Sequence, residues 1–373
     1  MKKIYLVLGG LLGLLVLSSP AETTNPPAIH YAIIGLVHDH ARGFIPGALA
    51  RTDVQLAGIV EPDRELASRY AAQYHLGTNL FYASLKELLA KTNVQAVAVF
   101  TSTFDHRRVV EECAPLGIHV MMEKPLAVNL ADALAMAAAA KQGGIRLIVN
   151  YETTWYPGNQ AAYQMVCEQQ AIGDLRKIVV HDGHQGPKEI GCSQDFLNWL
   201  TDPKLNGGGA LMDFGCYGAD LMTWLLHDQR PTSVLAVTQH IKPDVYPKVE
   251  DEATIIVTYP HAQGIIQASW NWPYNRKDLE LYGQTGYVLV PRSDLLRVLQ
   301  GNGKEREIPI TPLTGTQSNP LSHLAAVVRG EIKPTGLSSL EVNLVAMEIL
   351  DAARESARTG KRIDLPKQAP SVP

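Results

Sequence analysis

Short, continuously apolar runs alternate with helix-like stretches along the first part of the chain. The runs cover Tyr31–Gly35, Val54–Val60, Gln95–Phe100, Ile118–Met122 and Ile145–Val149. Between them, a helical spacing of apolar residues covers Arg64–Tyr74, Leu85–Lys91, Arg107–Leu116 and Leu130–Gln142. Strands that are apolar on both faces belong to parallel sheets covered by helices on both sides. The pattern predicts a doubly wound α/β domain of the Rossmann type, which binds dinucleotides, over residues 29–150.

Beyond Asn150 the alternation stops. A helical spacing covers Asn159–Gln169, a strand covers Lys177–His184, and after a long loop Gly207–Gly209 opens a long helix that reaches Leu225. Strand-like runs follow at Val234–His240, Ala253–Tyr259, Gly264–Trp270, Asp278–Tyr282 and Tyr287–Val290, with a hairpin turn at Gly283–Gly286. Two helices end the chain, and the second begins at Ser338 with Glu341 at the capping-box spacing. We expect an α+β domain over 151–373 whose mostly antiparallel open sheet pairs in a homo-oligomer by its exposed face.

The first residues have the pattern of a secretory signal. Lys2 and Lys3 precede an apolar run, and Ser19-Pro20-Ala21 places small residues where a signal peptidase cleaves. The run is about 14 residues long, short of the roughly 20 that a membrane-spanning helix needs, with a retained anchor as the alternative. We expect a signal peptide over 1–21, a linker over 22–28, and a mature chain exported to the periplasm or cell exterior without stable membrane insertion.

Composition narrows the possible partners. Charged residues make up 19% of the chain and the formal net charge is −4, without a basic patch or a long charge run. This argues against nucleic acid as a partner and favours a protein that handles small molecules. Cys113 and Cys167 fall on helix faces and are expected to be buried thiols, whereas a bond between Cys192 and Cys216 is left open. No cysteine or histidine spacing indicates a metal site.

The segment after the first apolar run has the position of a dinucleotide-binding loop without its full fingerprint. In the run from Gly35 to His40 (GLVHDH), Gly35 matches the first glycine of G-x-G-x-x-G, while Val37 and His40 replace the other two. The second glycine normally lets the backbone approach the phosphates, so Val37 must turn away or the phosphates must lie farther out. We expect Gly35, Val37, His38 and His40 to border the cofactor, with a ligand-free turn as the alternative.

Glu61 ends the second apolar run, 26 residues after Gly35. An acidic side chain at this point accepts hydrogen bonds from a ribose. Because a carboxylate repels a 2′-phosphate, Glu61 favours NAD over NADP. The alternative is a solvated loop acid.

Polar groups also follow the run that ends at Phe100. Thr101, Ser102 and His106 end that strand and open the next helix, where hydroxyl and amide groups suit an anionic or polyhydroxyl ligand. In the alternative, Thr103 or Asp105 only caps the helix.

Glu123-Lys124-Pro125 follows the predicted strand Ile118–Met122 of the first sheet. A lysine where a parallel strand ends lies in the crevice where open α/β sheets bind ligands. Proline fixes the direction of the turn, so the ammonium group is held in one direction. The charged pair at this crevice indicates chemistry on a polar substrate beside a cofactor.

Two segments resemble the Gfo/Idh/MocA family of nicotinamide-dependent sugar and polyol enzymes. They are Gly117–Ala127 (GIHVMMEKPLA) and Gly207–Tyr217 (GGGALMDFGCY), and the resemblance extends over nearly all of the mature chain. It implies that Lys124 contacts the nicotinamide ribose and the reacting hydroxyl, and that Asp213 and Tyr217 complete the catalytic set. A tyrosine rather than a histidine at position 217 is similar to glucose–fructose oxidoreductase and some aldose dehydrogenases.

The chemistry of these residues is consistent with that role. Asp213 and Tyr217 are four residues apart, so they share one helix face. Removing hydride from a carbinol carbon requires a base for the hydroxyl proton, and an unperturbed tyrosine pKa of about 10 is too high. We expect the Lys124 cation to lower the pKa of Tyr217, so that phenol and lysine pass a proton within one hydrogen-bonded set. The alternative is a core tyrosine and a surface lysine.

Other candidates surround this set. His181 and His184 bracket Asp182, and Asp182 shares a strand face with His184, which makes His184 a second acid/base candidate or a structural residue. Candidate sugar contacts are Trp155, Tyr156, His181, Asp195 and Trp199. Core packing is the commoner role of tryptophan, and a structural hydrogen bond is the alternative for His181.

Export and a nicotinamide cofactor together favour a cofactor that is tightly held and restored within each cycle. One expectation is a sugar oxidoreductase that oxidises one sugar and reduces another. An alternative is a redox-neutral glycoside hydrolase. Such an enzyme oxidises a ring hydroxyl to a ketone, eliminates the glycosidic group, adds water and returns the hydride to the sugar, as NAD-dependent glycosidases similar to this family do. A third is a non-catalytic dinucleotide or sugar sensor, against which Lys124, Asp213 and Tyr217 argue.

Overall fold

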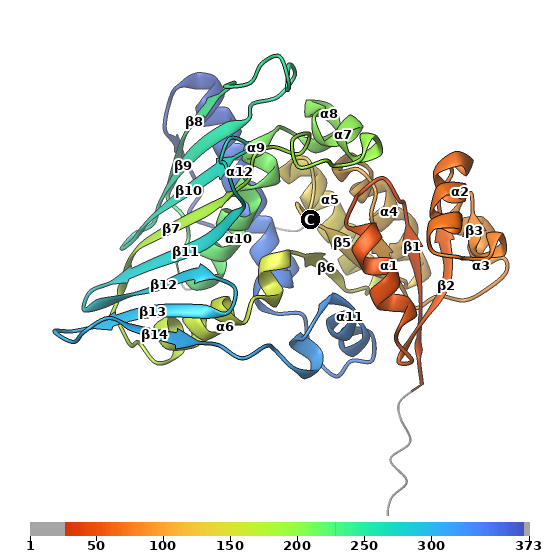
Figure 1. Ribbon diagram of the computed structural model, residues 1–373, viewed down its shortest axis with the longest axis horizontal. Helices are drawn as coiled ribbons and strands as arrows, with labels where there is room; N and C mark the ends of the chain where they lie inside the picture. Colours follow the sequence, from red (N-terminus) through yellow and green to blue (C-terminus); the bar gives the residue numbers. More distant parts are fainter. Residues whose placement is uncertain (1–26, 228, 369–373) are drawn as a thin grey trace, which may run out of the picture.

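Six parallel strands form the first sheet of the computed structural model, which describes residues 27–227 and 229–368 (Figure 1). The predicted signal peptide and nearly all of the linker lie outside the described residues. The strands are β1 (Ile29–Ile34), β2 (Val54–Val60), β3 (Phe81–Tyr82), β4 (Ala96–Val99), β5 (His119–Glu123) and β6 (Leu147–Asn150). Their order, β3-β2-β1-β4-β5-β6, reverses direction between β1 and β4. The doubly wound Rossmann arrangement is therefore confirmed, with its ligand crevice expected at this switch point.

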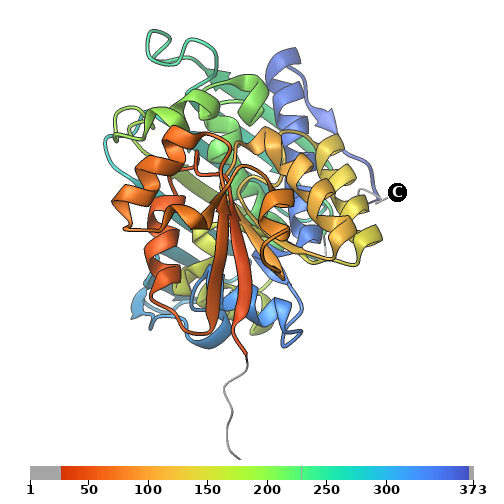
Figure 2. The same ribbon diagram turned by 90° about the vertical axis from the view of Figure 1, so that its right-hand side faces the viewer.

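Helices cover both faces of this sheet (Figure 2). They are α1 (Ala41–Leu49), α2 (Arg64–Gln73), α3 (Leu85–Leu89), α4 (His106–Cys113) and α5 (Leu130–Gly143). Local signals set their ends: the Asp63 carboxylate accepts hydrogen bonds from the N–H groups of Glu65 and Leu66 at the start of α2. Gly144 ends α5 in the left-handed conformation that glycine adopts readily. β4 is buried at every residue and β5 at all but His119, because apolar side chains on both of their faces meet a helix layer.

The second sheet has nine strands in the order β14-β13-β12-β11-β7-β10-β9-β8-β15. They are β7 (Leu175–Gly183), β8 (Ser233–Gln239), β9 (Glu252–Thr258), β10 (Gln263–Ser269), β11 (Arg276–Gly283), β12 (Gly286–Arg292), β13 (Leu295–Gln300), β14 (Arg306–Pro309) and β15 (Ile363–Asp364). All neighbours are antiparallel except β7 and β10. The predicted α+β fold with a mostly antiparallel sheet is thus confirmed, and the turn after Gly283 joins β11 to β12.

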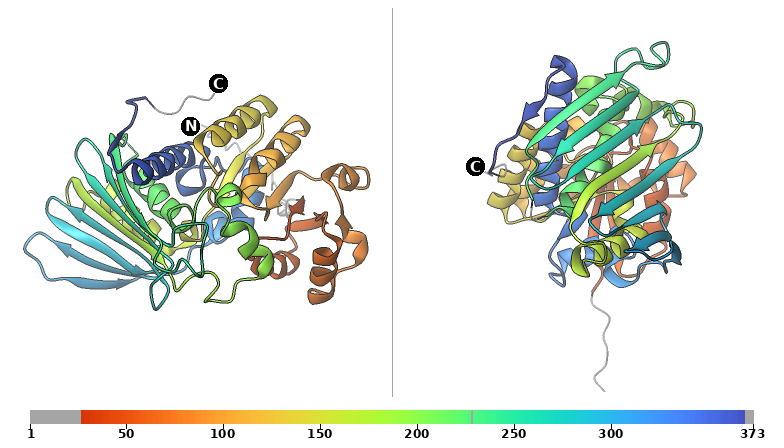
Figure 3. Two further views of the ribbon diagram at one scale, coloured as in Figure 1. Left: turned by 90° about the horizontal axis from the view of Figure 1, so that it is seen from above. Right: turned by 90° about the vertical axis from the view of Figure 1, so that its left-hand side faces the viewer.

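One face of the second sheet is packed and the other is open (Figure 3). The remaining helices are α6 (Pro157–Tyr163), α7 (Gln194–Leu200), α8 (Pro203–Asn206), α9 (Ala210–Asp213), α10 (Gly215–Leu225), α11 (Pro320–Val328) and α12 (Leu340–Thr359). Helices α10 and α12 lie against the sheet and separate it from the first domain. Among the described residues, no helix is both long enough and apolar enough to cross a membrane.

Several local expectations were wrong. The predicted continuous helix from Gly207 to Leu225 is broken at Phe214, which separates α9 from α10. The cap of the last helix is Ser339, whose hydroxyl accepts from the Val342 N–H, and not the buried Ser338. The long loop after β7 contains α7 and α8, because side-chain caps at Ser193 and Asp202 stabilise helices too short for a clear apolar period.

None of the four cysteines, all of which the structure describes, forms a disulfide, so Cys192 and Cys216 are not bonded to each other. Cys113 is buried as expected, whereas Cys167 is only half-buried and was wrongly placed in the core. Its Sγ lies 3.4 Å from the carbonyl oxygen of Leu225.

Candidate active site

Three strand ends meet at one edge of the first sheet. Gly35 follows β1, Thr101 follows β4 and Lys124 follows β5, and these strands are neighbours in the sheet. Gly35 has φ +80°, and a Cβ added there would lie 2.6 Å from Thr101 Cγ2. Glycine is therefore required at this position for two reasons, backbone conformation and the close approach of the β4 loop.

Glu61 holds the loop rather than standing in solvent. One carboxylate oxygen accepts from the Leu36 N–H and the other from the Asp63 N–H, each at 2.9 Å. Burial raises the pKa of Glu61, and the two backbone donors oppose that rise. The solvated-acid alternative is thus wrong, because the side chain is buried. Its role toward a ribose stays a prediction.

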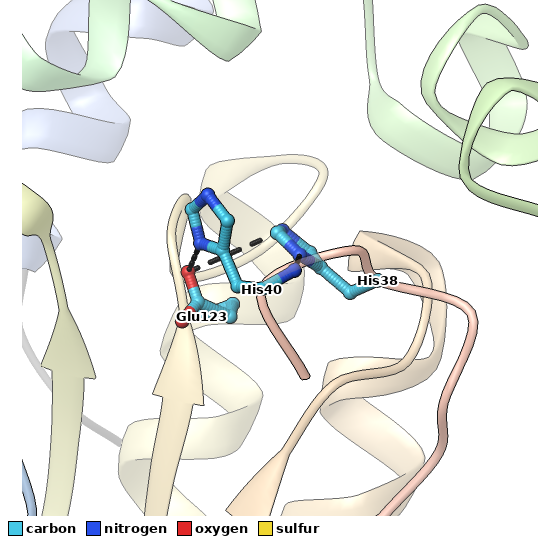
Figure 4. Close-up of side chains that lie close together, drawn as sticks. All are labelled: His38, His40 and Glu123. Carbon is cyan, nitrogen blue, oxygen red and sulfur yellow. Dashed lines mark hydrogen bonds and ion pairs between the residues drawn. The ribbon is translucent and has the colours of Figure 1, made fainter. Parts of the chain in front are cut away.

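His38, His40 and Glu123 point toward one another at this edge (Figure 4). His40 Nδ1 lies 2.9 Å from Glu123 Oε2, and the other Glu123 oxygen accepts from the Asn150 amide at 2.8 Å. His38 is buried, and its Nε2 is 4.0 Å from Glu123 Oε2 without a hydrogen-bond partner among the described residues. Burial raises the pKa of Glu123, but His40, Asn150 and Lys124 outweigh it and leave the pKa lowered.

The hydrogen bonds of this cluster define which groups donate. The His40 N–H donates to His38 Nδ1 at 3.2 Å, so a neutral His38 ring carries its hydrogen on Nε2. Burial also lowers the pKa of His38 well below its usual range. The cluster therefore presents a donor rather than a free nitrogen lone pair at His38. A second group with ligand-type atoms, His181, Asp278 and Glu280, occurs on the other sheet, and the expectation that no metal binds stays a prediction.

Thr101, Ser102 and His106 lie at the same edge, but some of their polar atoms already make hydrogen bonds within the protein. The Thr101 hydroxyl donates to the Ser102 carbonyl oxygen at 3.0 Å, and the Ser102 hydroxyl donates to Asp105 Oδ2 at 2.8 Å. His106 Nδ1 lies 3.1 Å from the Leu126 carbonyl oxygen, while Nε2 is buried without a described partner. Of the two alternative caps, Asp105 does hold the N-cap position of α4, although its side chain makes no capping hydrogen bond, and Thr103 holds no cap position.

Lys124 and Asp213 form a buried ion pair between the two domains. Lys124 Nζ donates to Asp213 Oδ1 at 2.5 Å and to the Asp213 carbonyl oxygen at 3.0 Å. The Trp270 indole N–H donates to the other carboxylate oxygen at 2.9 Å. Burial would lower the pKa of Lys124, but the charge of Asp213 outweighs it and raises that pKa. For Asp213, the lysine outweighs burial and lowers the pKa. Both groups are therefore charged at neutral pH.

Two ammonium groups lie close to the ring of Tyr217. Lys124 Nζ is 5.1 Å and Lys277 Nζ 4.9 Å from the centre of its ring. The tyrosine is buried, and burial, followed by the charge of Glu152, raises its pKa well above the ordinary value. The expectation that Lys124 lowers this pKa is wrong, because the lysine faces the ring and its charge is neutralised by Asp213. The phenol is consequently neutral in the protein alone.

Glu152, whose charge acts on this phenol, is held by two other residues of the second domain. Its carboxylate accepts from the Tyr156 hydroxyl at 2.6 Å and forms an ion pair with Lys277. Burial raises the pKa of Glu152, but Lys277 outweighs it and leaves the pKa lowered. Tyr156, predicted as a substrate contact, thus lies beside the catalytic candidates. A cavity of about 470 Å³, lined in part by Glu152, Tyr156, His184 and Lys277, opens at this point.

His184 and Asp182 occupy the end of β7, next to Lys277. The Gly186 N–H donates to His184 Nδ1 at 2.9 Å, and burial lowers the pKa of His184 to about 4. Its neutral ring therefore carries hydrogen on Nε2. Asp182 is opposite Lys277 in the sheet register and is buried, and neither carboxylate oxygen has a partner among the described residues. Burial raises the pKa of Asp182 well above its usual range.

Four predicted contacts lie away from this set. His181 points to the opposite side of β7 from Asp182, with Nδ1 2.7 Å from Asp278 Oδ1. Asp195 pairs with Arg69 at 2.6 Å. Trp199 packs against His38, and its indole N–H donates to the Val37 carbonyl oxygen at 3.3 Å. Trp155 donates to Asn150 Oδ1 at 2.9 Å and lines a different cavity.

Lys277 and Glu152 were not predicted, because they are single charged residues without a motif. Lys277 reaches Tyr217 only because β11 pairs with β7, and this pairing is not visible in the spacing of either strand.

Comparisons with known proteins agree with this architecture. A family model described as "Oxidoreductase family, NAD-binding Rossmann fold" matches residues 29–151, and one described as "GFO/IDH/MocA C-terminal domain" matches residues 160–289. The chain is 24% identical over 321 residues to trans-1,2-dihydrobenzene-1,2-diol dehydrogenase of Mus musculus, covering 83% of this chain and 90% of that protein.

Solved structures are similar over most of the chain. The aldose-aldose oxidoreductase of Caulobacter crescentus, complexed with glycerol, has a TM-score of 0.78 and 26% identity, covering 91% of this chain and 100% of that one. An inositol dehydrogenase homologue of Azotobacter vinelandii, complexed with NAD⁺, has a TM-score of 0.79 and covers 91% of this chain and 98% of its own. At 19% identity, the second likeness shows the fold alone.

Proposed function

Because this chain belongs to the Gfo/Idh/MocA family of NAD-binding oxidoreductases, we propose that it transfers hydride between a carbohydrate carbinol carbon and NAD. The matched relatives are dehydrogenases, reductases and oxidoreductases, which supports an enzyme rather than a sensor. The observation that carries the proposal is the meeting of Lys124, Asp213 and Tyr217 beside the crevice of the first sheet.

The residues at the crevice fit a dinucleotide. Gly35 leaves space where a Cβ would meet the β4 loop, and the buried His38 Nε2–H has no partner among the described groups. A donor that is buried and unpaired suits the phosphates or ribose of NAD. Glu61 supports NAD over NADP through its negative charge. When bound, NAD supplies the hydride acceptor.

Lys124 and Tyr217 then act on the hydroxyl that is oxidised. The Lys124 cation is held by Asp213, whose other carboxylate oxygen accepts from Trp270, and it orients the substrate oxygen. Tyr217 exchanges the hydroxyl proton, and its high pKa makes the neutral phenol a proton donor in the reducing direction. His184 presents a neutral Nε2–H that can hold a neighbouring sugar hydroxyl.

The experiment is a nucleotide assay followed by turnover. The purified mature protein is denatured, and NAD is measured in the supernatant before and after incubation with added NAD. Aldoses and inositols are then screened for reduction of the nicotinamide. If the protein neither retains NAD from its source nor binds added NAD, the proposal is contradicted.

One observation favours a second function, redox-neutral glycoside cleavage. This route requires a proton for the leaving group after the neighbouring C–H proton is removed. The Asp182 carboxyl is held neutral by burial, two residues before His184 on the same strand face, and is a candidate for that proton. The net reaction consumes one water and returns the hydride. Release of phenol from p-nitrophenyl glycosides without added NAD would support cleavage, whereas lactone or ketose formation from sugar pairs would support the oxidoreductase.

Export and oligomerisation also belong to the proposal. The signal pattern at residues 1–21 supports export. The open face of the second sheet carries exposed apolar side chains at Leu235, Val237 and Tyr282, which supports pairing with another copy. A monomer in light scattering would contradict the proposed pairing through the second sheet. An uncleaved N-terminus in mass spectrometry of exported protein would contradict the proposed signal peptide.

A further inference from the structure

The segment that follows β7 is anchored by one lysine from a distant loop. Lys242 lies in the connection between β8 and β9, and its Nζ donates to three oxygens at once. They are the Gln185 carbonyl oxygen at 2.6 Å, the Trp270 carbonyl oxygen at 2.7 Å and Glu189 Oε1 at 2.5 Å. An ammonium group has three hydrogens, so each of them has an acceptor within the protein. The lysine therefore ties these three groups together.

The carbonyl group of Gln185 belongs to the same peptide unit as the N–H group of Gly186. This unit is trans, so it is planar and its C=O and N–H groups are directed to opposite sides. Lys242 holds the oxygen, and the N–H on the other side donates to His184 Nδ1 at 2.9 Å. A bond that fixes the direction of the carbonyl group thus also fixes the direction of the N–H group. A donor on the carbonyl oxygen also polarises the peptide unit and strengthens the bond that its N–H donates.

The other attachment points of Lys242 are themselves held. The Trp270 N–H donates to the Asp251 carbonyl oxygen at 2.9 Å, and its indole N–H donates to Asp213. The Lys242 N–H donates to Asp251 Oδ2 at 2.6 Å. The lysine consequently connects the peptide unit after His184 to a wall of the candidate active site that is fixed at several points.

Glu189 balances the charge of Lys242. Its other carboxylate oxygen accepts from the Tyr246 hydroxyl, which in turn accepts from the Lys188 N–H at 3.1 Å. Burial raises the pKa of Glu189, but Lys242 and Tyr246 outweigh it and leave the pKa lowered, so the carboxylate is charged at neutral pH. A Cβ added at Gly186 would lie 2.5 Å from Tyr246 Oη and 2.9 Å from Lys242 Nζ. Glycine therefore leaves the space that these groups occupy against the peptide unit.

The bond from Gly186 decides what His184 offers to a ligand. With Nδ1 as an acceptor, a neutral ring carries its hydrogen on Nε2 and donates to a sugar oxygen. If the peptide unit turned away, the ring would be free to carry its hydrogen on Nδ1 and would then only accept at Nε2. The backbone of His184 has other supports, since its N–H donates to the Ser269 carbonyl oxygen at 3.1 Å and its carbonyl oxygen accepts from the Trp272 N–H at 3.2 Å. Loss of the lysine should therefore change the ring and leave the strand end in place.

We propose that Lys242 is a positioning residue that keeps His184 in its Nε2–H form and thereby sets how the site binds a sugar hydroxyl. It acts through the Gln185–Gly186 peptide unit and not on the substrate. The inference rests on the role in sugar binding proposed above for His184, but the position of the ring hydrogen can be measured without any substrate.

The first test is ¹⁵N NMR of the full mature chain labelled at histidine, recorded at neutral pH. The proteins are the wild type, Lys242→Met and Lys248→Met, with His184→Phe to assign the signals of His184. The wild type should show a protonated Nε2 and an unprotonated Nδ1, whereas Lys242→Met should show a mixture that includes the Nδ1–H form. Lys248→Met is the matched control and should resemble the wild type, because Lys248 lies on the same loop but pairs with Asp202 at 3.1 Å.

Kinetics then separates positioning from a general structural effect. Lys242→Met should raise the KM for the sugar by about tenfold, the contribution of one hydrogen bond, and should change kcat by less than about threefold. Adding Lys242→Met to His184→Phe should raise KM no further, because both substitutions remove the same donor. If Lys242→Met does not fold, Lys242→Gln replaces it in both measurements. A single amide does not supply three donors, so this variant should also populate the Nδ1–H form.

The inference is overturned if His184 carries its hydrogen on Nδ1 in the wild type, or if a folded Lys242 variant keeps the wild-type form of the ring. It is also overturned if the effects of the Lys242 and His184 substitutions on KM are additive. A wild type that turns over no sugar would contradict the proposed function instead, and the NMR spectra would still decide the role of Lys242.

Discussion

Lys277 places its ammonium group 4.9 Å from the centre of the Tyr217 ring, and the Lys124 ammonium group lies 5.1 Å from the same point. The phenol is therefore bordered by two cations, each already paired with a carboxylate, Asp213 or Glu152. This explains how a tyrosine can be buried next to positive charge and still keep its proton. The arrangement fits a group that donates a proton to a substrate carbonyl and takes it back in the reverse direction.

Tyr217→Phe should lower turnover by roughly 10²–10⁴-fold, the usual contribution of a general acid or base. Folding should be unaffected, because only the hydroxyl is lost. Tyr151→Phe is the matched control, since Tyr151 is also buried and its ring packs edge-on against Tyr217 at 5.4 Å. Steady-state kinetics and thermal unfolding of both variants measure the effect. Equal rates for Tyr217→Phe and Tyr151→Phe would refute the assignment.

Lys277→Met should shift the pH profile of sugar oxidation to higher pH. Removing Lys277 leaves the Glu152 carboxylate, whose charge already raises the pKa of Tyr217, without its partner. The pKa of Tyr217 should therefore rise further, which delays the gain of activity with increasing pH. A merely structural lysine would lower the rate without moving the profile. Lys177→Met, on the exposed part of β7, is the control. An unshifted profile for Lys277→Met would show that this cation has no part in proton transfer.

Asp213→Asn should destabilise the protein by about 3–5 kcal/mol, because it leaves the buried Lys124 charge without its partner. The lowered pKa of Asp213 means that its contribution is present above the unfolded-state pKa of about 4 and is lost as pH falls through the folded-state value. The raised pKa of Lys124 keeps its contribution complete below about pH 10. Urea unfolding should therefore show the largest difference between variant and wild type near neutral pH, and a smaller one in acid. A difference that is independent of pH would contradict the ion pair.

Asp182→Asn and Asp220→Asn should both make stability less dependent on pH. Each carboxyl is buried with its pKa raised by burial, so the folded state binds a proton that the unfolded state releases above about pH 4. Wild-type stability should accordingly fall as pH rises from 4 toward these raised values, by up to about 1.4 kcal/mol per pH unit for each group. Each asparagine variant removes one such contribution.

The two variants should differ in catalysis. Asp182 lies opposite Lys277 in the sheet, whereas burial is the sole cause of the raised pKa of Asp220. Asp182→Asn should change KM or kcat, and Asp220→Asn should change neither by more than about twofold. Matching kinetics for both variants would exclude Asp182 from the site.

The alternation of apolar runs was sufficient to predict the first domain, because parallel strands buried on both faces leave a strong pattern. The meeting of Lys124 with Asp213 and Tyr217 was also predictable, through two motifs with specific spacing. Lys277 and Asp182 were not recognised as part of the site, since their position depends on how β7 and β11 pair. Trp155 was placed near the crevice by its position after β6, yet its ring faces another cavity, because the indole N–H turns toward Asn150.

Transfer of deuterium from substrate to nicotinamide tests the central claim most directly. The NAD-loaded mature protein is incubated with sugars deuterated at carbon, and the nucleotide released on denaturation is analysed by mass spectrometry. The proposed chemistry predicts one deuterium on the nicotinamide with the wild type and little with Tyr217→Phe, whether the net reaction is oxidoreduction or cleavage. Consumption of sugar with no deuterium on the recovered nucleotide would contradict it.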